Sequence, residues 1–247
     1  KLPLLRDPDS SYYLRQEKDG LLLGPYEYNC KAHWITEDDP RPADFSFQLW
    51  NDDLERLEWY IEDAINRVPI LGSGGITRVV NGPIPYAPDG LPLIGPMPGV
   101  PNAFEACVFT FGIVQAGGAG KLMAEMITEG ETESDSWAVD PRRFTDHVDR
   151  DYSIAKAIET YSHEYAMHFP HIQWPAGRGA KKSPLYDTLK SKGAAFGSYG
   201  GWERAEYFLA DGEEEKMVDS YNHQPSFDAV GAECRHVAEH AGLLDLT

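Results

Sequence analysis

Hydrophobic and polar positions alternate along the first part of the chain as they do in antiparallel strands. Residues 12–17 and 21–27 alternate in this way on either side of a Lys-Asp-Gly turn, which predicts a β-hairpin. A period of two places Tyr13, Arg15 and Glu17 on one face of this hairpin. By itself, this pattern is also that of an ordinary sheet surface.

Helical spacing follows a polar loop at residues 35–50. Asn51 fits the N-cap of a helix that runs to about Val68. We expect this helix to face the core, because five apolar residues share one side of it: Leu54, Leu57, Ile61, Ala64 and Ile65. Residues 76–81 predict a further strand.

The next stretch is dense in proline and glycine. Residues 85–90 (PYAPDG) predict a chain reversal, and the apolar runs 91–94 and 103–111 predict buried strands. The stretch from Gly112 to Lys121 then turns at glycine into a helix that continues through residues 122–127. A helix that starts at a glycine presents unpaired backbone N–H groups, and an anionic or carbonyl-rich ligand can approach them closely. Alternatively, the glycines at 117, 118 and 120 serve only to pack the helix tightly on a neighbour.

Two common phosphate-binding signatures are excluded in this stretch. A P-loop requires glycine five positions before Gly120 and Ser or Thr after Lys121, whereas this chain has Gln115 and Leu122 there. A G-x-G-x-x-G fingerprint is also absent from the sequence.

The second half of the chain begins with the polar segment 131–136, a candidate domain boundary. Residues 137–144 introduce a helical region that is predicted to reach Pro170, with five residues on one side: Ile154, Ala157, Ile158, Tyr161 and Tyr165. Its HEYAMH run resembles a zinc-protease helix, but the two histidines are five positions apart and therefore roughly 140° apart around a helix. His236 and His240 have no evident third ligand, so no metal site is predicted.

A last helix is predicted near the end of the printed sequence. Ser226 fits its N-cap and Gly242 its stop, with an apolar face made of Val230, Cys234, Val237 and Ala241.

Composition narrows the class of protein. The 247 residues carry 22 basic and 40 acidic side chains, a net charge of −18, which argues against nucleic acid and anionic membrane as partners. Three widely spaced cysteines indicate reduced thiols rather than a disulfide framework. No apolar run approaches the roughly 20 residues of a membrane span.

Five segments of the sequence carry resemblances to known families. NGPIPYAPDGLPLIGPMPGVPNAF, followed by GIVQAGGAGKLMAEMITEG, resembles the end of the flavin domain in dimethylglycine and sarcosine dehydrogenases. LRDPDSSYYLRQEKDGLLLGPYE resembles their substrate-domain strands. The segments SPLYDTLKSKGAAFGSYGGWERAEYF and SFDAVGAECRHVAEHAGLLDLT resemble the start of an aminomethyltransferase domain, the T-protein of glycine cleavage.

The resemblance implies an α+β fold, the C-terminal part of a D-amino-acid-oxidase-like flavin and substrate domain followed by further segments. The implied divisions are 1–80 for part of the substrate-binding domain, 81–135 for the return segment of the FAD domain, 136–182 for a linker domain, and 183–247 for the start of a folate-binding domain. The chain starts at Lys1 in mid-pattern, so it is expected to belong to a longer polypeptide or to pair with a complementary chain.

The resemblance also implies an activity and its cofactors. A methylated glycine, dimethylglycine or sarcosine, would be oxidised on FAD, and its one-carbon unit would pass to tetrahydrofolate. Electrons would leave to an electron-transfer flavoprotein or to oxygen, in a bacterial cytoplasm or the mitochondrial matrix. The alternative is a non-catalytic relative that keeps the scaffold, of the phosphatase-regulatory-subunit type. A stand-alone aminomethyltransferase is disfavoured because only the first segment of such a domain is present.

Six residues receive roles from the resemblance. Tyr13 corresponds to the tyrosine that the family places over the flavin, and it is the candidate catalytic residue. The backbone of Phe111, Gly112 and Ile113 would donate to the flavin carbonyls. The remaining two, Arg15 and Tyr86, are candidate substrate contacts.

Overall fold

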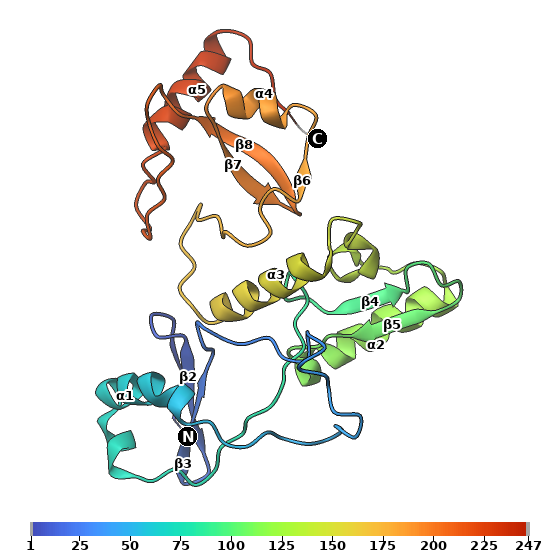
Figure 1. Cartoon of the computed structure of the whole chain (residues 1–247), viewed down its shortest axis with the longest axis vertical. Helices are drawn as coiled ribbons and strands as arrows, with labels where there is room; N and C mark the ends of the chain where they lie inside the picture. Colours follow the sequence, from blue (N-terminus) through green and yellow to red (C-terminus); the bar gives the residue numbers. More distant parts are fainter. Residues whose placement is uncertain (1, 246–247) are drawn as a thin grey trace. The chain divides into compact units, whose positions relative to one another are not determined.

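The structure, a computed structural model, describes residues 2–245 and divides into two compact units (Figure 1). The first unit contains the chain up to residue 145 together with residues 153–167. The second contains residues 146–152 and the chain from residue 168 onward. None of the helices described here combines the length and the apolar character that crossing a membrane requires.

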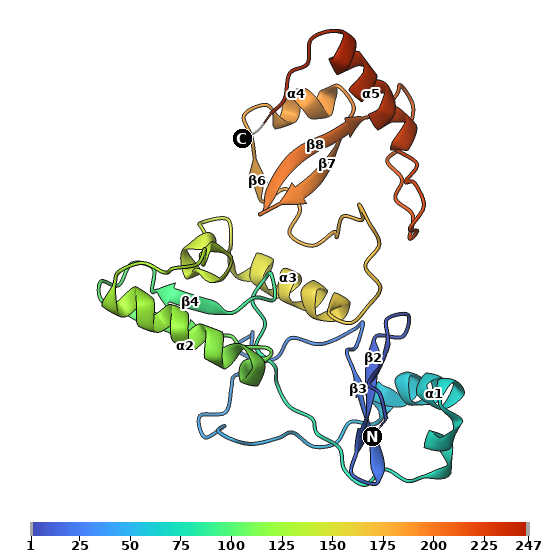
Figure 2. The same ribbon diagram turned by 180° about the vertical axis from the view of Figure 1, so that it is seen from behind.

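The first unit begins with the predicted hairpin. Strands β1 (Leu5–Asp7), β2 (Tyr12–Glu17) and β3 (Gly20–Pro25) form an antiparallel sheet in that order. Tyr12 and Leu14 of β2 are buried, and the alternate positions face away from them, as the period of two predicted. Figures 1 and 2 show helix α1 (Glu58–Arg67) beside this sheet.

Helix α1 is confirmed, but the prediction of Asn51 as its N-cap was wrong. A short 3₁₀ turn, η1 (Glu55–Leu57), precedes the helix, and the Oδ1 atom of Asp53 accepts from the backbone N–H of Arg56 at 3.3 Å. The N-cap residue is Leu54 for η1 and Leu57 for α1, and neither side chain makes a capping bond. Tyr60 and Ala64 are the buried residues of α1, which is followed by the 3₁₀ segment η2 (Pro69–Ser73).

The strand predicted over Ile76–Asn81 is not formed. These residues have no regular secondary structure, and the backbone N–H of Trp50 donates to the carbonyl of Asn81 at 2.8 Å. A β-branched run alone does not make a strand, since a strand also requires a partner edge to satisfy its backbone groups.

The central stretch forms the predicted strand pair and helix, but the second strand is shorter than predicted and is not buried, since Phe104 is 38% exposed. Strands β4 (Leu93–Pro96) and β5 (Phe104–Cys107) pair antiparallel, and helix α2 (Gly112–Thr128) lies along them in both views (Figures 1 and 2). Ile94 of β4 and, on α2, Ala119 and Met126 are buried.

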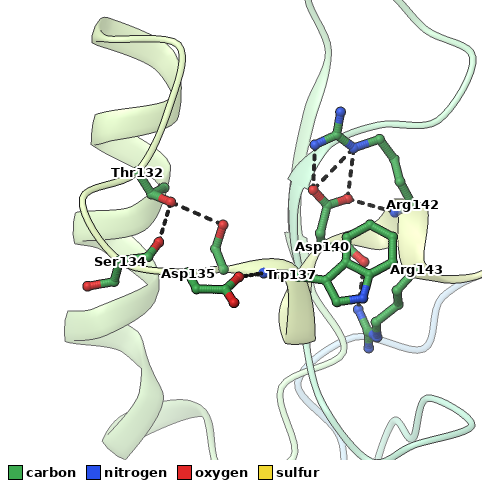
Figure 3. A network of polar contacts seen from close by, with 8 residues as sticks. Thr132, Ser134, Asp135, Trp137, Asp140, Arg142 and Arg143 are labelled. Atoms are coloured by element: carbon green, nitrogen blue, oxygen red, sulfur yellow. Dashed lines mark hydrogen bonds and ion pairs between the residues drawn. The ribbon is translucent and has the colours of Figure 1, made fainter. Parts of the chain in front are cut away.

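Polar contacts hold the segment between α2 and α3 in place (Figure 3). Two 3₁₀ turns, η3 (Trp137–Val139) and η4 (Pro141–Arg143), flank Asp140, whose carboxylate receives several hydrogen bonds from Arg142. The almost fully buried side chain of Arg143 donates to both carboxylate oxygens of Asp89, at 2.7 and 3.0 Å. This pair fixes the 85–90 turn, where Gly90 has a φ of 74° as a glycine turn requires.

Helix α3 (Arg150–His163) ends earlier than predicted. We predicted helix as far as Pro170, but the guanidinium of Arg6 donates to the carbonyl of Glu164 at 3.2 Å, and the N–H of Met167 donates to the carbonyl of Pro8 at 2.9 Å. These long-range bonds take the backbone out of the helix. His168 therefore lies outside α3, whereas His163 is its last residue.

The second unit is a small sheet with two helices. Strands β6 (Lys181–Lys182), β7 (Ala194–Tyr199) and β8 (Trp202–Phe208) run in the order β6-β8-β7, with β6 parallel and β7 antiparallel to β8. Helix α4 (Tyr186–Ser191) and helix α5 (Phe227–Glu239) complete the unit.

Helix α5 begins at the predicted position. Ser226 is its N-cap residue, although the Ser226 side chain makes no capping bond. The predicted apolar face is not buried, since Val230 and Val237 remain 37% and 50% exposed. The backbone N–H of Phe208 instead reaches α5 through the carboxylate of Glu233, at 2.7 Å.

A buried ion pair ties the second unit together. The guanidinium of Arg178 donates to both carboxylate oxygens of Glu203 and to the carbonyl of Phe196. The N–H of Gly179 adds a bond to the same carboxylate at 2.6 Å. Burial alone would raise the pKa of Glu203, but the hydrogen bonds from Arg178 and Gly179 outweigh it and hold this pKa below its ordinary value.

This pair makes the stability of the second unit pH-dependent. Because the folded pKa of Glu203 is depressed, the pair stabilises the fold fully above the ordinary pKa of 4.5, and this stabilisation is lost as the pH falls through the lower folded pKa. We expect amide-exchange protection of β7 and β8 to fall across that window. The Glu203→Gln variant should lack this step, and an identical pH profile for the two proteins would contradict the assignment.

Candidate functional site

The loop between β5 and α2 is strained and open. Val108 has a φ of 59°, a left-handed conformation that is costly for a β-branched residue and occurs mainly where the surrounding structure imposes it. Phe111 is the N-cap of α2, and the first helical bond runs from the N–H of Gln115 to the carbonyl of Phe111 at 3.1 Å. The N–H groups of Gly112, Ile113 and the residue that follows precede that bond, so the helix itself leaves them unpaired.

The apolar side chains at the start of α2 are exposed to solvent. Ile113 is 97% exposed and Val114 is 82% exposed, which is unusual for apolar residues in a helix. A Cβ atom built at Gly117, Gly118 or Gly120 would meet nothing within 4 Å. Within the residues described, these glycines therefore do not serve a close helix contact, which removes the packing explanation there.

The turn that carries Tyr86 approaches this loop. The hydroxyl of Thr110 donates to the carbonyl of Pro85 at 3.3 Å, which joins the residue before Phe111 to the residue before Tyr86. The hydroxyl of Tyr86 is buried and makes no hydrogen bond of ordinary geometry among the described residues, although the side chain of Thr110 lies near enough to act on its pKa. Burial, followed by the nearby Glu164, raises the pKa of Tyr86, so its phenol keeps its proton.

A line of tyrosine rings connects Tyr13 with Tyr86. Tyr13 packs on Tyr165 with ring centroids 5.6 Å apart, and Tyr165 stacks on Tyr26 at 4.4 Å. Tyr26 contacts Tyr161 at 5.3 Å, and Tyr161 meets Tyr86 edge-on, also at 5.3 Å. The structure thus brings two of the predicted site residues, from distant parts of the sequence, into one continuous aromatic row.

Tyr13 also lies across the neighbouring strand. Gly24 faces Tyr13 in the β2–β3 register, and a Cβ atom at Gly24 would come within 2.2 Å of the tyrosine ring. The glycine therefore leaves the space that the ring occupies.

Arg15 does not join this row. Its guanidinium pairs with Glu17 at 2.5 Å, and the side chains are 44% and 49% exposed, so the pair lies on the solvent face of β2. Arg6 is the cation that contacts the row, with its guanidinium carbon 4.6 Å from the centre of the Tyr165 ring.

A cavity of about 530 Å³ lies next to Tyr86 and Tyr161. Glu27 lines it, and its carboxylate accepts from the hydroxyl of Tyr161 and pairs with the Nε atom of Arg56 at 3.0 Å. Burial, together with the bond to Glu27, raises the pKa of Tyr161. The cavity therefore has a phenol, a carboxylate and a guanidinium already ordered on its wall.

Sequence reasoning missed most of this cluster. Tyr161 and Tyr165 were noted only as part of a helix face, and Tyr26, Glu27 and Arg6 received no role. Tyr161 and Glu27 are separated by 134 positions, so no local spacing could have paired them. The only available signal was the i,i+4 spacing of Tyr161 and Tyr165 within the predicted helix, although α3 ends at His163 and only Tyr161 lies on it.

Comparison with known proteins identifies the family. The chain belongs to the FAD dependent oxidoreductase family, whose sequence model matches residues 1–126. The model described as the FAD dependent oxidoreductase central domain matches residues 129–183.

The relatives are amine-oxidising enzymes by name. The chain is 40% identical to mitochondrial dimethylglycine dehydrogenase of Mus musculus over its full length and spans 29% of that protein. It is 37% identical to mitochondrial sarcosine dehydrogenase of Mus musculus, with 84% of this chain and 22% of that protein aligned. It is 34% identical to the 4-methylaminobutanoate oxidase (formaldehyde-forming) of Paenarthrobacter nicotinovorans, covering all of this chain and 30% of that protein.

A more distant relative is not named as an oxidoreductase. The mitochondrial pyruvate dehydrogenase phosphatase regulatory subunit of Mus musculus is 28% identical over 99% of this chain and 28% of its own length. The chain spans less than a third of each of these relatives.

Proposed function

We propose that the protein oxidises the N-methyl group of a methylated glycine, dimethylglycine or sarcosine, with FAD as its cofactor. The observation that carries this proposal is the open start of α2 beside the turn of Tyr86, in a chain of the FAD dependent oxidoreductase family. The similarity to dimethylglycine and sarcosine dehydrogenases supports the choice of substrate class. Electrons would leave to an electron-transfer flavoprotein or to oxygen.

The residues at the start of α2 fit the edge of a flavin ring. Unpaired backbone donors at Phe111, Gly112 and Ile113 suit the carbonyl oxygens of its pyrimidine side, and the exposed Ile113 offers an apolar surface. A Cβ atom at Gly112 would meet only the Cβ atom of Phe109, at 3.7 Å, so the space beyond Gly112 is open to a ligand. The flavin would supply the chemistry by accepting the hydride of the methyl group.

The side chains of this chain would position the amine. We propose Tyr13 as the catalytic tyrosine, a hydroxyl donor that orients the substrate at the reacting carbon. Tyr86 would contact the substrate with its unpartnered hydroxyl, and its position on the cavity wall supports that role. Arg15 remains a proposed substrate contact on the face of β2 that also carries Tyr13.

A second proposed step concerns the segment from residue 183 onward. Its resemblance to the start of a T-protein domain supports transfer of the released one-carbon unit to tetrahydrofolate. A mitochondrial matrix or a bacterial cytoplasm would suit this pathway, given relatives named mitochondrial and one from a bacterium.

The alternative is a scaffold relative without amine oxidation. The similarity to the phosphatase regulatory subunit favours it, at the lower identity of 28%. Flavin retention and turnover of dimethylglycine by the full-length protein distinguish the two proposals, since a scaffold relative would show no turnover.

The flavin contact is tested by the Gly112→Val variant of the full-length protein. Because Gly112 is not crowded by this chain, a valine there should leave the fold intact and should disturb only a bound flavin. We expect weaker flavin retention or a shifted absorption spectrum. Gly118→Val, at an equally open position further along α2, is the matched control. Full flavin occupancy with an unaltered spectrum in Gly112→Val would mean that this loop does not contact the ring.

A further inference from the structure

The cavity beside Tyr86 is lined by more cationic than anionic side chains, whereas the protein as a whole is acidic. The chain as a whole has 40 acidic and 22 basic residues, yet the cavity is lined by two cations, Lys31 and Arg56, and by one carboxylate, Glu27. Glu27 and Arg56 pair with each other at 3.0 Å, which leaves the wall with a positive excess. A ligand with an anionic group is favoured in such a cavity, because field lines concentrate within low-dielectric walls.

Neighbouring side chains hold Arg56 in one orientation, and some of its guanidinium N–H groups have no protein partner in the described part of the chain. Its Nε atom faces Glu27, and its Nη2 atom donates to the side-chain carbonyl of Asn81 at 3.0 Å. Asp53 approaches the Nε atom only to 3.9 Å. Among the residues described, the Arg56 side chain donates a hydrogen bond only through Nη2, its buried Nε atom has no hydrogen-bond partner, and the side chain lines the cavity and is 30% exposed. A guanidinium that is already oriented and still has unpaired N–H groups can donate hydrogen bonds to a carboxylate.

Tyr86 adds a second donor to the same wall. Its buried hydroxyl has no partner among the described residues, and a buried hydroxyl without a partner is costly unless a ligand or water satisfies it. Arg56 and Tyr86 therefore both offer hydrogen bonds to an acceptor in the cavity.

Three aromatic side chains, Trp34, Trp50 and His33, also line the cavity. Trp34 and Trp50 meet edge-on with centroids 5.5 Å apart, and His33 contacts Trp50 at 4.8 Å. Aromatic faces attract methylated ammonium groups, which are too weakly hydrated to prefer bulk water strongly. Arg15, by contrast, lies on the exposed face of β2 and lines no part of this cavity.

We infer that this cavity binds a small N-methylated amino acid, with Arg56 and Tyr86 holding the carboxylate and Trp34 and Trp50 contacting the methylated nitrogen. Arg56 is thereby the residue that selects for the carboxylate. This inference rests on the proposed function and deepens it by naming the specificity residue.

The test compares two amines that differ only in the group Arg56 recognises. Dimethylglycine has a carboxylate where dimethylethanolamine has a hydroxymethyl group. In the full-length protein we expect Arg56→Met to lower kcat/KM for dimethylglycine by about 100-fold, chiefly through KM, and to leave dimethylethanolamine almost unchanged. Arg56→Lys should recover part of the discrimination. Arg78→Met, an exposed arginine outside the cavity lining, is the matched control.

A paired variant separates binding from folding. Arg56→Met leaves the Glu27 carboxylate without its cation, which could destabilise the fold. Glu27→Gln/Arg56→Met removes both charges and keeps an acceptor for Tyr161, so it should fold and should still lose the discrimination. Unchanged discrimination in this folded double variant overturns the inference.

A binding measurement separates the failure of this inference from the failure of the proposed function. Trp34 and Trp50 line the cavity, so dimethylglycine should quench tryptophan fluorescence saturably in the unaltered protein and not in the double variant. Quenching without any amine oxidation would reject the proposed function and keep the binding site. Oxidation of dimethylglycine with identical quenching in both proteins would keep the function and reject this site.

Discussion

Replacing Arg178 with methionine is expected to destabilise the second unit by about 3–5 kcal/mol. The side chain of Glu203 is only 2% exposed and would be left as a buried carboxylate without its cation. The carbonyl of Phe196 would lose its bond from Arg178 in the same change. Both losses fall on the sheet that forms the centre of this unit.

Amide hydrogen exchange measures this loss locally. Protection should fall in β7 and β8 and stay unchanged in β2 and β3, because the ion pair lies entirely within the second unit. The loss should shrink at acidic pH, where Glu203 takes up a proton and no longer needs a counter-charge.

The matched control is Arg204→Met in the same strand. Arg204 has a buried Nε atom with no hydrogen-bond partner in the residues described, so its removal breaks no such pair. Equal destabilisation by both variants would show that the effect comes from the side-chain stem rather than from the ion pair.

The sequence predicted those helices and strands that are determined by residues close together in the chain. The hairpin of β2 and β3 follows from alternation around a Lys-Asp-Gly turn, and α2 forms in the glycine-rich stretch where a helix was expected. The errors have tertiary causes. Residues 76–81 found no partner strand, and α3 stopped at His163 because the backbone beyond it bonds to Pro8 and is reached by Arg6.

The candidate site likewise has features that the sequence could predict and features that it could not. The open helix start could be predicted because glycine and helix geometry act within a few residues. The row from Tyr13 to Tyr86 could not be predicted, because its members come from β2, from α3 and the segment after it, and from the segments after β3 and before β4. The pairing of Glu27 with Arg56 likewise depends on how α1 meets the chain after β3, which no spacing in the sequence expresses.

Replacing Tyr13 with phenylalanine is expected to lower kcat for dimethylglycine by one to three orders of magnitude in the full-length protein, roughly the effect of losing one catalytic hydrogen bond. The fold should persist, because the phenylalanine ring can keep the contact with Tyr165. Steady-state kinetics with separate kcat and KM values measure the effect, and unchanged kinetics would remove Tyr13 from the catalytic site.

Gly24 allows the same tyrosine to be moved without changing its chemistry. A methyl group at Gly24 would lie 2.2 Å from the Tyr13 ring, so Gly24→Ala must displace that ring and should lower kcat as well. Gly20→Ala is the matched control in the same strand, since its Cβ atom would approach nothing closer than the carbonyl of Glu17 at 3.8 Å. If Gly24→Ala lowers kcat while Tyr13→Phe does not, the ring serves only packing, because its hydroxyl would then be dispensable. If both lower kcat and Gly20→Ala does not, the position and the hydroxyl of Tyr13 are both needed for turnover.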